Sequence, residues 1–326
     1  MRPFVLKGHE RAITRVRCNK DGDLLFTTAK DKQCCLWYTE NGERVGTYNA
    51  AASIFDVDVS YDSRHVITGS GDNMFILWDT ETGTKLGQID ADTGIKAVGF
   101  GYTGNLVFYC STARMRLDGK LCVLDVRDGD HVQGKDSVIT IPMSSTANAA
   151  VWSCLEEKIT TGHDKGELYQ YDLRSGNEPV NFNKDDHVRG EIRDIQMSDD
   201  QTMMITASKD KTAKLWDAQN LVAKKTYKAE RPVNSAVIAP DYSHIILAGG
   251  EEAMHVTQTT QTGGHFEAKF YHLIFEEEYA RVKGHFGPIN SMCYLPTDDT
   301  FVSGGEDGFV RIQKLDDDLK QFEMDY

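Results

Sequence analysis

Short apolar segments alternate with polar turns along the whole chain. Segments such as 65–68 and 204–207 are rich in β-branched and aliphatic residues, which is typical of strands. Between such segments lie Asp-, Gly- and Pro-containing turns, for example 19–22 and 240–241, which reverse the chain. The segments lack the 3.6-residue period of an amphipathic helix. The pattern therefore predicts an all-β protein.

The pattern also repeats at a nearly constant interval. Leu-Trp pairs occur at Leu36-Trp37, Leu77-Trp78 and Leu215-Trp216, and alignment places four more repeats on the same position. The seven aligned positions are Trp37, Trp78, Leu124, Tyr171, Trp216, His272 and Gln313. The first five positions are 41 to 47 residues apart. The sixth repeat is longer: its segment 231–235 aligns with 287–291 of the seventh repeat at an offset of 56 residues. Seven such repeats, each with four short strands, predict a seven-bladed β-propeller.

A single domain accommodates all seven repeats. The predicted blades are 7–48, 49–90, 91–137, 138–184, 185–229, 230–283 and 284–315, the last completed by residues 1–6. The segment Pro3 to Leu6 precedes the first repeat at the place where every other repeat has its fourth strand, so we expect it to close the ring. The tail 316–326 either is an appendage or competes for the same edge.

Histidine, serine, aspartate and tryptophan recur at matching places in the repeats. This arrangement resembles the hydrogen-bonding set of the WD-repeat family, in which these side chains link a turn to a strand inside one blade. The set satisfies several buried polar groups at once. In the second repeat, 49–52 replaces the expected Gly-His pair, so its set is incomplete. The structural positions are His9, Asp31, Trp37, Asp72, Trp78, His187, Ser208, Asp210, Trp216, His285 and Asp307.

Charge and composition exclude several classes of protein. The chain has 36 Lys and Arg against 50 Asp and Glu, a net charge of -14 without a basic stripe, which argues against direct nucleic-acid binding. No apolar run reaches the ~18 residues of a membrane span, and no signal peptide is recognisable. The seven cysteines include no C-x-x-C pair, so we expect reduced thiols in the cytoplasm and no metal site.

Three motifs with possible chemistry are better explained by structure. Gly69-Ser70-Gly71 lacks the Lys-Ser or Lys-Thr that a phosphate-binding loop requires. The pair His163-Asp164 falls in a turn of the fourth repeat, where a structural role is expected. Cys34 and Cys35 are adjacent in a predicted strand, so their side chains face opposite ways. We therefore expect no catalytic site and no cofactor.

Three stretches go beyond the general WD pattern. They include Gly8-His9-Glu10-Arg11, Gly249-Gly250-Glu251-Glu252 and Gly264-His265-Phe266-Glu267. Together they closely resemble subunit i of eukaryotic translation initiation factor 3, over essentially the whole chain, and a hairpin insertion would account for the long sixth repeat. The resemblance implies a scaffold subunit of that complex, which holds the C-terminal helix of the b subunit, contacts the g subunit and sits indirectly on the 40S pre-initiation complex during scanning.

If a basic helical partner docks on this protein, exposed acids outside the structural positions are the candidates. Asp200 follows the first strand of the fifth repeat and Asp217 follows its Trp position, so both are expected on the rim of that blade. The alternative is that they are ordinary turn residues. Glu276-Glu277-Glu278 is either an acidic docking patch or a solvated connection. The competing functions are a WD-repeat adaptor in a signalling or ubiquitin-ligase complex and a propeller enzyme.

Overall fold

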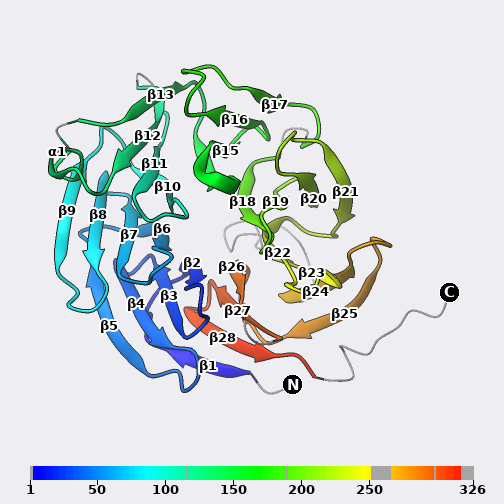
Figure 1. Ribbon diagram of the computed structural model, residues 1–326. Helices are drawn as coiled ribbons and strands as arrows, with labels where there is room; N and C mark the ends of the chain where they lie inside the picture. Colours follow the sequence, from blue (N-terminus) through cyan, green and yellow to red (C-terminus); the bar gives the residue numbers. More distant parts are fainter. Residues whose placement is uncertain are drawn as a thin grey trace.

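The computed structural model describes residues 3–114, 117–134, 136–187, 190–250, 266–296 and 299–316. They form seven four-stranded antiparallel sheets arranged around a central axis (Figure 1). The predicted all-β, seven-bladed propeller is confirmed. The tail residues 317–326, which include Asp317 and Asp318, and the predicted hairpin insertion within 251–265 lie outside the described residues.

In each blade the strands follow one another from the central axis to the outer edge. Blade 1 contains β2 (Ile13–Cys18), β3 (Leu24–Ala29), β4 (Gln33–Tyr38) and β5 (Arg44–Asn49). Blade 2 contains β6 (Ile54–Val59), β7 (His65–Ser70), β8 (Met74–Asp79) and β9 (Lys85–Asp90). Blade 3 contains β10 (Ile95–Phe100), β11 (Leu106–Ser111), β12 (Gly119–Asp125) and β13 (Ile139–Met143), with the short helix α1 (Gly129–Val132) before β13.

The remaining four blades repeat this order. Blade 4 contains β14 (Ala147–Trp152), the 3-10 turn Cys154–Glu156, β15 (Lys158–His163), β16 (Leu168–Asp172) and β17 (Asn181–Asn183). Blade 5 contains β18 (Ile192–Met197), β19 (Met203–Ser208), β20 (Thr212–Asp217) and β21 (Ala223–Lys228). Blade 6 contains β22 (Val233–Ile238), β23 (His244–Gly249), β24 (Glu267–His272) and β25 (Glu278–Lys283). Blade 7 contains β26 (Ile289–Tyr294), β27 (Thr300–Gly305) and β28 (Phe309–Lys314).

The N-terminal strand β1 (Phe4–Lys7) is the fourth strand of blade 7. It pairs antiparallel with β28, with Phe4 opposite Ile312 and Lys7 opposite Phe309. Figure 1 shows the two strands side by side although they come from opposite ends of the chain. The predicted closure of the ring by the N-terminal segment is confirmed.

The hydrophobic core lies between neighbouring blades rather than inside any one of them. Ile67 and Leu77 of blade 2, for example, pack in one cluster with Val98 and Val107 of blade 3. Glycine permits the closest approaches: a Cβ added at Gly69 would lie 2.7 Å from Cγ2 of Ile95 in the next blade. Gly69 and Ser70 therefore belong to a strand packed against its neighbour, and the phosphate-loop interpretation is excluded.

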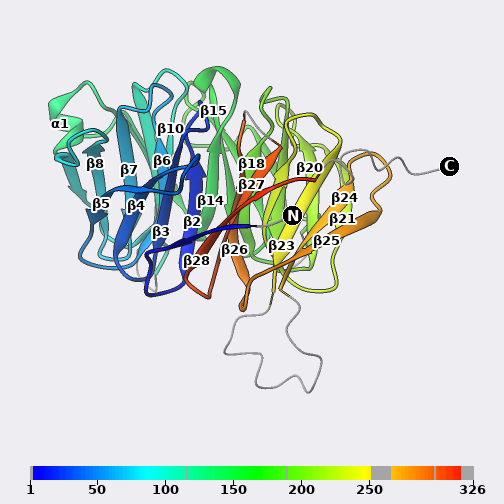
Figure 2. The same ribbon diagram turned by 90° about the horizontal axis from the view of Figure 1, so that it is seen from below.

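Because each blade is an antiparallel meander, its turns lie at two opposite faces of the disc, as the edge-on view in Figure 2 shows. One face carries the turn between the first and second strands and the turn between the third and fourth strands of every blade. We call it the first-turn face. The other carries the turn between the second and third strands and the connections between blades.

Candidate partner-binding surfaces

A chain of hydrogen bonds runs through blade 5 from a turn to its third strand. His187 Nδ1 lies 2.8 Å from Asp210 Oδ2, and its Nε2 lies 2.7 Å from Thr206 Oγ1. Trp216 Nε1 donates to the same hydroxyl at 2.9 Å, and the indole is fully buried. The His187 ring, the Thr206 hydroxyl and the Trp216 indole N–H all have hydrogen-bond partners although they are buried. The network holds the turn at His187 against the strands of the blade.

The bridging hydroxyl is Thr206 and not Ser208, which was the residue expected from the sequence. Ser208 Oγ instead accepts the backbone N–H of Asp210 at 3.2 Å. Both side chains point to the same face of the strand because they are two residues apart, and both are fully buried, but only Thr206 bonds to the imidazole and the indole. A constant spacing would have identified it, since a Thr stands ten residues before Trp37, Trp78 and Trp216.

Blade 1 contains the same network as blade 5. His9 Nδ1 lies 2.9 Å from Asp31 Oδ2, and its Nε2 lies 2.8 Å from Thr27 Oγ1. Trp37 Nε1 donates to Thr27 at 2.9 Å. His9, Asp31 and Trp37 are therefore brought together as expected, and Thr27 is the member that sequence reasoning missed.

Blade 2 has the incomplete version that its sequence suggested. Trp78 Nε1 donates to Thr68 Oγ1 at 3.0 Å, and the backbone N–H of Ala51 donates to Asp72 Oδ2 at 3.2 Å, as the Glu10 N–H does to Asp31 in blade 1. Ser70 Oγ also donates to Asp72. Blade 2 therefore lacks the histidine of blades 1 and 5, and Ser70 is the side chain that donates to the turn aspartate in its place.

Blade 7 has Gln313 at the position where blades 1, 2 and 5 have tryptophan, and Arg311, two residues earlier, joins its hydrogen-bonding set instead. His285 Nε2 lies 2.9 Å from Ser303 Oγ, and its Nδ1 lies 3.1 Å from Asp307 Oδ1. Arg311 Nη1 donates to Asp307 Oδ2 at 3.0 Å. Burial opposes ionisation of Asp307, but the bonds from His285 outweigh it and hold the pKa of this carboxyl well below its usual range.

An arginine crosses the central channel. Arg15 of β2 donates through Nε to Asp56 Oδ1 of blade 2 at 2.8 Å and through Nη1 to Asp194 Oδ1 of blade 5 at 2.6 Å. All three side chains are buried. Burial opposes the charge of Arg15, but the two carboxylates hold its pKa above the ordinary value. This ionic cluster joins three blades that are not all neighbours.

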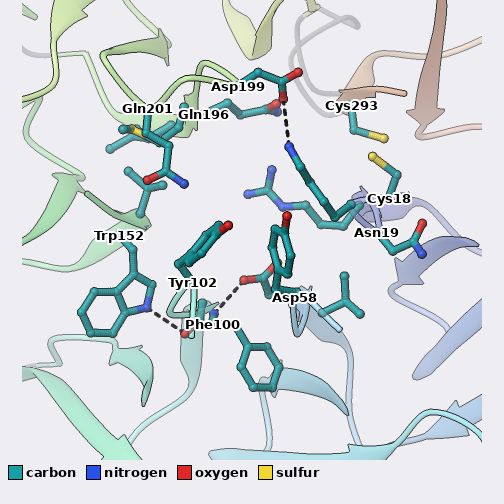
Figure 3. A pocket seen from close by; sticks show the side chains of 18 of the residues that line it. Cys18, Asn19, Asp58, Phe100, Tyr102, Trp152, Gln196, Asp199, Gln201 and Cys293 are labelled. Carbon is teal, nitrogen blue, oxygen red and sulfur yellow. Dashed lines mark hydrogen bonds and ion pairs between the residues drawn. The ribbon is translucent and has the colours of Figure 1, made fainter. Parts of the chain in front are cut away.

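The channel opens at the first-turn face into a cavity of about 350 Å³ (Figure 3). Tyr61 and Tyr102 are in contact at its rim, with ring centroids 4.6 Å apart and ring planes tilted by 49°, and Lys20 pairs across it with Asp199 at 3.9 Å. Asp58 in its wall accepts the backbone N–H of Phe100 at 2.7 Å. Burial raises the pKa of Asp58 to about 6.

A second cavity of about 550 Å³ opens on the opposite face. Arg15 belongs to its lining together with Lys30, Lys96, Lys209 and Glu191. Because β2 runs from this face to the other, the Arg15 cluster lies between the two openings.

Asp200 lies in the turn between β18 and β19 and is exposed on the first-turn face. Its carboxylate accepts from Ser198 Oγ at 2.6 Å, from Thr202 Oγ1 at 2.7 Å and from the backbone N–H of Thr202 at 3.1 Å. The hydroxyl of Tyr242, from blade 6, accepts the Asp200 N–H at 3.3 Å. Burial opposes ionisation, but the hydroxyl donors outweigh it and lower the pKa of Asp200.

Asp217 lies at the end of β20, in the turn to β21, and so reaches the same face as Asp200. Its Oδ1 accepts the N–H of Gln219 at 3.0 Å, and its Oδ2 lies 3.3 Å from Lys224 Nζ. Hydrogen bonding from the Gln219 N–H lowers the pKa of Asp217. Both acids therefore order a turn and also present negative charge on the face.

The seam between blades 5 and 6 adds apolar surface beside these acids. Val222, in the same turn as Asp217, is 57% exposed, and Ile274 and Phe275 of blade 6 are 58% and 45% exposed. Lys225 Nζ donates to the carbonyl of Ile274 at 2.7 Å and pairs with Glu276 at 3.2 Å, so the two outer edges are joined. Exposed apolar groups flanked by acids suit a helix with one apolar and one basic face.

The other residues considered for a chemical role, His163, Cys34 and Cys35, are packed inside the blades. His163 is buried between Ser145 Oγ at 2.8 Å and Thr161 Oγ1 at 2.9 Å, and burial lowers its pKa to about 4. Cys34 and Cys35 are buried in β4. Among the described residues, no three His, Cys, Asp or Glu side chains gather as metal ligands, and no helix is long and apolar enough to cross a bilayer.

Comparison with known proteins places the whole chain in one family. A family model described as EIF3I matches residues 1–325. Eukaryotic translation initiation factor 3 subunit I of Brugia malayi is 50% identical over 328 residues, that of Caenorhabditis elegans 47% over 328 and that of Homo sapiens 46% over 327, with 100% of both chains covered each time. With its seven blades closed by β1, the chain belongs to the family of eukaryotic translation initiation factor 3 subunit I.

Proposed function

We propose that this protein is a non-catalytic scaffold of translation initiation factor 3 in the cytoplasm. It holds the C-terminal helix of the b subunit, contacts the g subunit and thereby supports assembly of the 40S pre-initiation complex and scanning. The observation that carries the proposal is the group of exposed acids and apolar side chains where blades 5 and 6 meet. Membership of the subunit I family supports assembly into translation initiation factor 3. The negative charge of this surface supports a basic helix as the bound segment.

The helix of the b subunit docks across the seam with basic residues toward Asp200 and Asp217. The hydroxyl donors that lower the pKa of Asp200 keep its carboxylate ionised, so an arriving cation meets a negative charge at this turn. The apolar side of the helix covers Val222, Ile274 and Phe275. Apolar contacts contribute affinity, and the charges fix orientation and speed the encounter.

Charge reversal tests this arrangement. In the variant Asp200→Lys/Asp217→Lys we expect affinity for the b-subunit helix to fall by about tenfold or more, because attraction becomes repulsion. Titration calorimetry with the helical segment measures the affinity, and thermal unfolding of the free propeller measures stability. Retention of the g subunit in a co-expressed complex shows whether the effect is confined to one partner.

Blade 2 provides a matched control. Asp62 and Asp79 hold the same places in their turns: Asp62 accepts from Ser60 Oγ at 2.6 Å, and Asp79 accepts the N–H of Thr82 at 3.0 Å. The variant Asp62→Lys/Asp79→Lys removes equivalent turn bonds and should keep full affinity. Equal losses of binding in both double variants, or unfolding of the blade 5 variant alone, would contradict the proposed docking site.

A further inference from the structure

Two thiols meet where the first and last blades adjoin. Cys18 ends β2 in blade 1, and Cys293 lies in β26 of blade 7, both on the wall of the cavity at the first-turn face. In Figure 3 their sulfur atoms point toward each other. Cys18 Sγ also donates to the carbonyl of Tyr294 at 3.1 Å, which holds the thiol against β26.

Cys18 differs from the other cysteines whose side chains are described, and its buried neighbour Cys293 resembles them. Cys34, Cys35, Cys110 and Cys122 are buried, and burial raises the pKa of Cys34 and Cys110 well above the ordinary value. Cys18 is partly exposed in a cavity that opens to solvent. The hydrogen bond with Cys293 outweighs burial and, with the Arg17 guanidinium nearby, lowers the pKa of Cys18. The thiolate is the reactive form, so Cys18 is the more reactive partner.

We propose that Cys18 and Cys293 form a redox-modification site at which a peroxide introduces a disulfide between blades 1 and 7. The Cys18 thiolate attacks one peroxide oxygen and the O–O bond breaks, which gives a sulfenic acid and hydroxide. The hydroxide takes up the proton that Cys18 released on ionisation and becomes water. The Cys293 sulfur then attacks the Cys18 sulfur, and hydroxide leaves and takes up the proton of Cys293 as a second water. Two thiols and one hydrogen peroxide thus yield one disulfide and two waters.

The bond would strengthen the seam at which the ring closes. There the two ends of the chain are held by β1 pairing with β28 and by a cluster that includes Leu6, Val16 and Leu295. Cys18 packs against that cluster, and Cys293 belongs to it. A covalent link between the first and last inner strands would constrain the unfolded chain across most of its length. The oxidised protein should therefore open more slowly at this seam.

The test uses the full-length protein, reduced and then treated with hydrogen peroxide under native conditions. We expect a mass loss of two hydrogen atoms, one cross-linked peptide pair that contains Cys18 and Cys293, and an unfolding rate lower by about tenfold, all reversed by a thiol reductant. Cys18→Ser and Cys293→Ser should abolish the cross-link and the change in rate. Cys110→Ser is the matched buried control and should abolish neither, and Cys154→Ser should leave both unchanged.

Three results would overturn the proposal. One is oxidation of Cys18 to the sulfinic or sulfonic acid without a cross-link, which would mean that Cys293 cannot reach it. Another is a cross-link that uses any other cysteine. The third is an unmodified chain at peroxide concentrations that oxidise free glutathione in the same tube. The comparison of oxidised with reduced wild-type protein needs no substitution, so the result stands even if a serine variant folds poorly.

Discussion

Some single residues on the channel wall have pKa-shifting environments that their local sequence does not predict. Asp58 is the example with the largest consequence for pH. Its carboxylate accepts the Phe100 N–H, and burial raises its pKa to about 6, although Arg17 nearby opposes the rise. A carboxyl whose pKa is higher in the folded state adds stability only when protonated, that is, at low pH. The contribution is lost as pH rises through about 6.

Asp58→Asn should therefore stabilise the protein at pH 7, by about 1–2 kcal/mol after allowance for solvent in the cavity. The asparagine carbonyl can still accept the Phe100 N–H, so the hydrogen bond is kept. The gain should shrink toward zero as pH falls from 7 to 4.5. Urea unfolding of the variant and the wild type across this range measures it. Asp62→Asn should behave oppositely, because the pKa of Asp62 is lowered, and an equal gain at every pH would contradict the assignment.

At the scale of elements, the strand that closes the ring is short but well anchored. β1 contributes four residues, and of these Leu6 is 3% exposed whereas Val5 is 38% exposed. Leu6 lies opposite Val310 and packs in a cluster with Trp37 of blade 1, so one side chain links β1 to two blades. Leu6 is the one buried residue of β1, so it anchors this strand to the cluster that closes the ring.

Leu6→Ala should cost about 2–4 kcal/mol in the free energy of unfolding, because it leaves a cavity at the seam. Amide hydrogens of β28 should exchange faster in this variant, since β1 covers that strand. Val5→Ala, on the outward face, should change stability by less than about 0.5 kcal/mol. Chemical unfolding and hydrogen exchange measure the two effects, and equal costs for both substitutions would refute the inward anchoring of β1.

At the scale of the molecule, the Arg15 cluster holds the inner strands around one point. The cluster extends beyond its two ion pairs, because Asp56 Oδ2 accepts the N–H of Val98 in blade 3 at 2.9 Å and Asp194 Oδ2 accepts from Ser235 Oγ of blade 6 at 2.6 Å. Five blades therefore meet in one buried network. Buried ionic groups add little net stability when paired, but loss of one partner leaves costly uncompensated charge.

Arg15→Met should destabilise the propeller by about 3–5 kcal/mol, because it leaves two buried carboxylates without a cation. Adding Asp194→Asn to that variant should recover part of the loss, whereas Asp194→Asn alone should be destabilising. A double-mutant cycle from urea unfolding separates these effects. A cost below about 1 kcal/mol for Arg15→Met would mean that the cluster is not a buried ionic network.

Much of the architecture follows from spacing along the chain. Positions 41 to 47 residues apart predict the repeat, and the segment before His9 predicts the closing strand, because strands within a blade are consecutive and pair with their neighbours. The residues of one hydrogen-bonding set also lie within a single repeat. Their roles could be assigned from order alone, except that Thr206 performs the role expected of Ser208. Thr206 bonds to both His187 and Trp216, whereas Ser208 accepts the backbone N–H of Asp210, so position along the strand decided between the two hydroxyls.

Contacts between distant blades were decided only by the tertiary structure. Arg15 and Asp194 are separated by 179 positions, and Cys18 and Tyr294 by 276. No local period encodes such a pair, because it depends on where the ring brings the inner strands together. The sequence by itself determined the seven blades, their closure and the family. The charges across the channel, the paired thiols at its mouth and the acids beside an apolar seam exist only once the ring has closed.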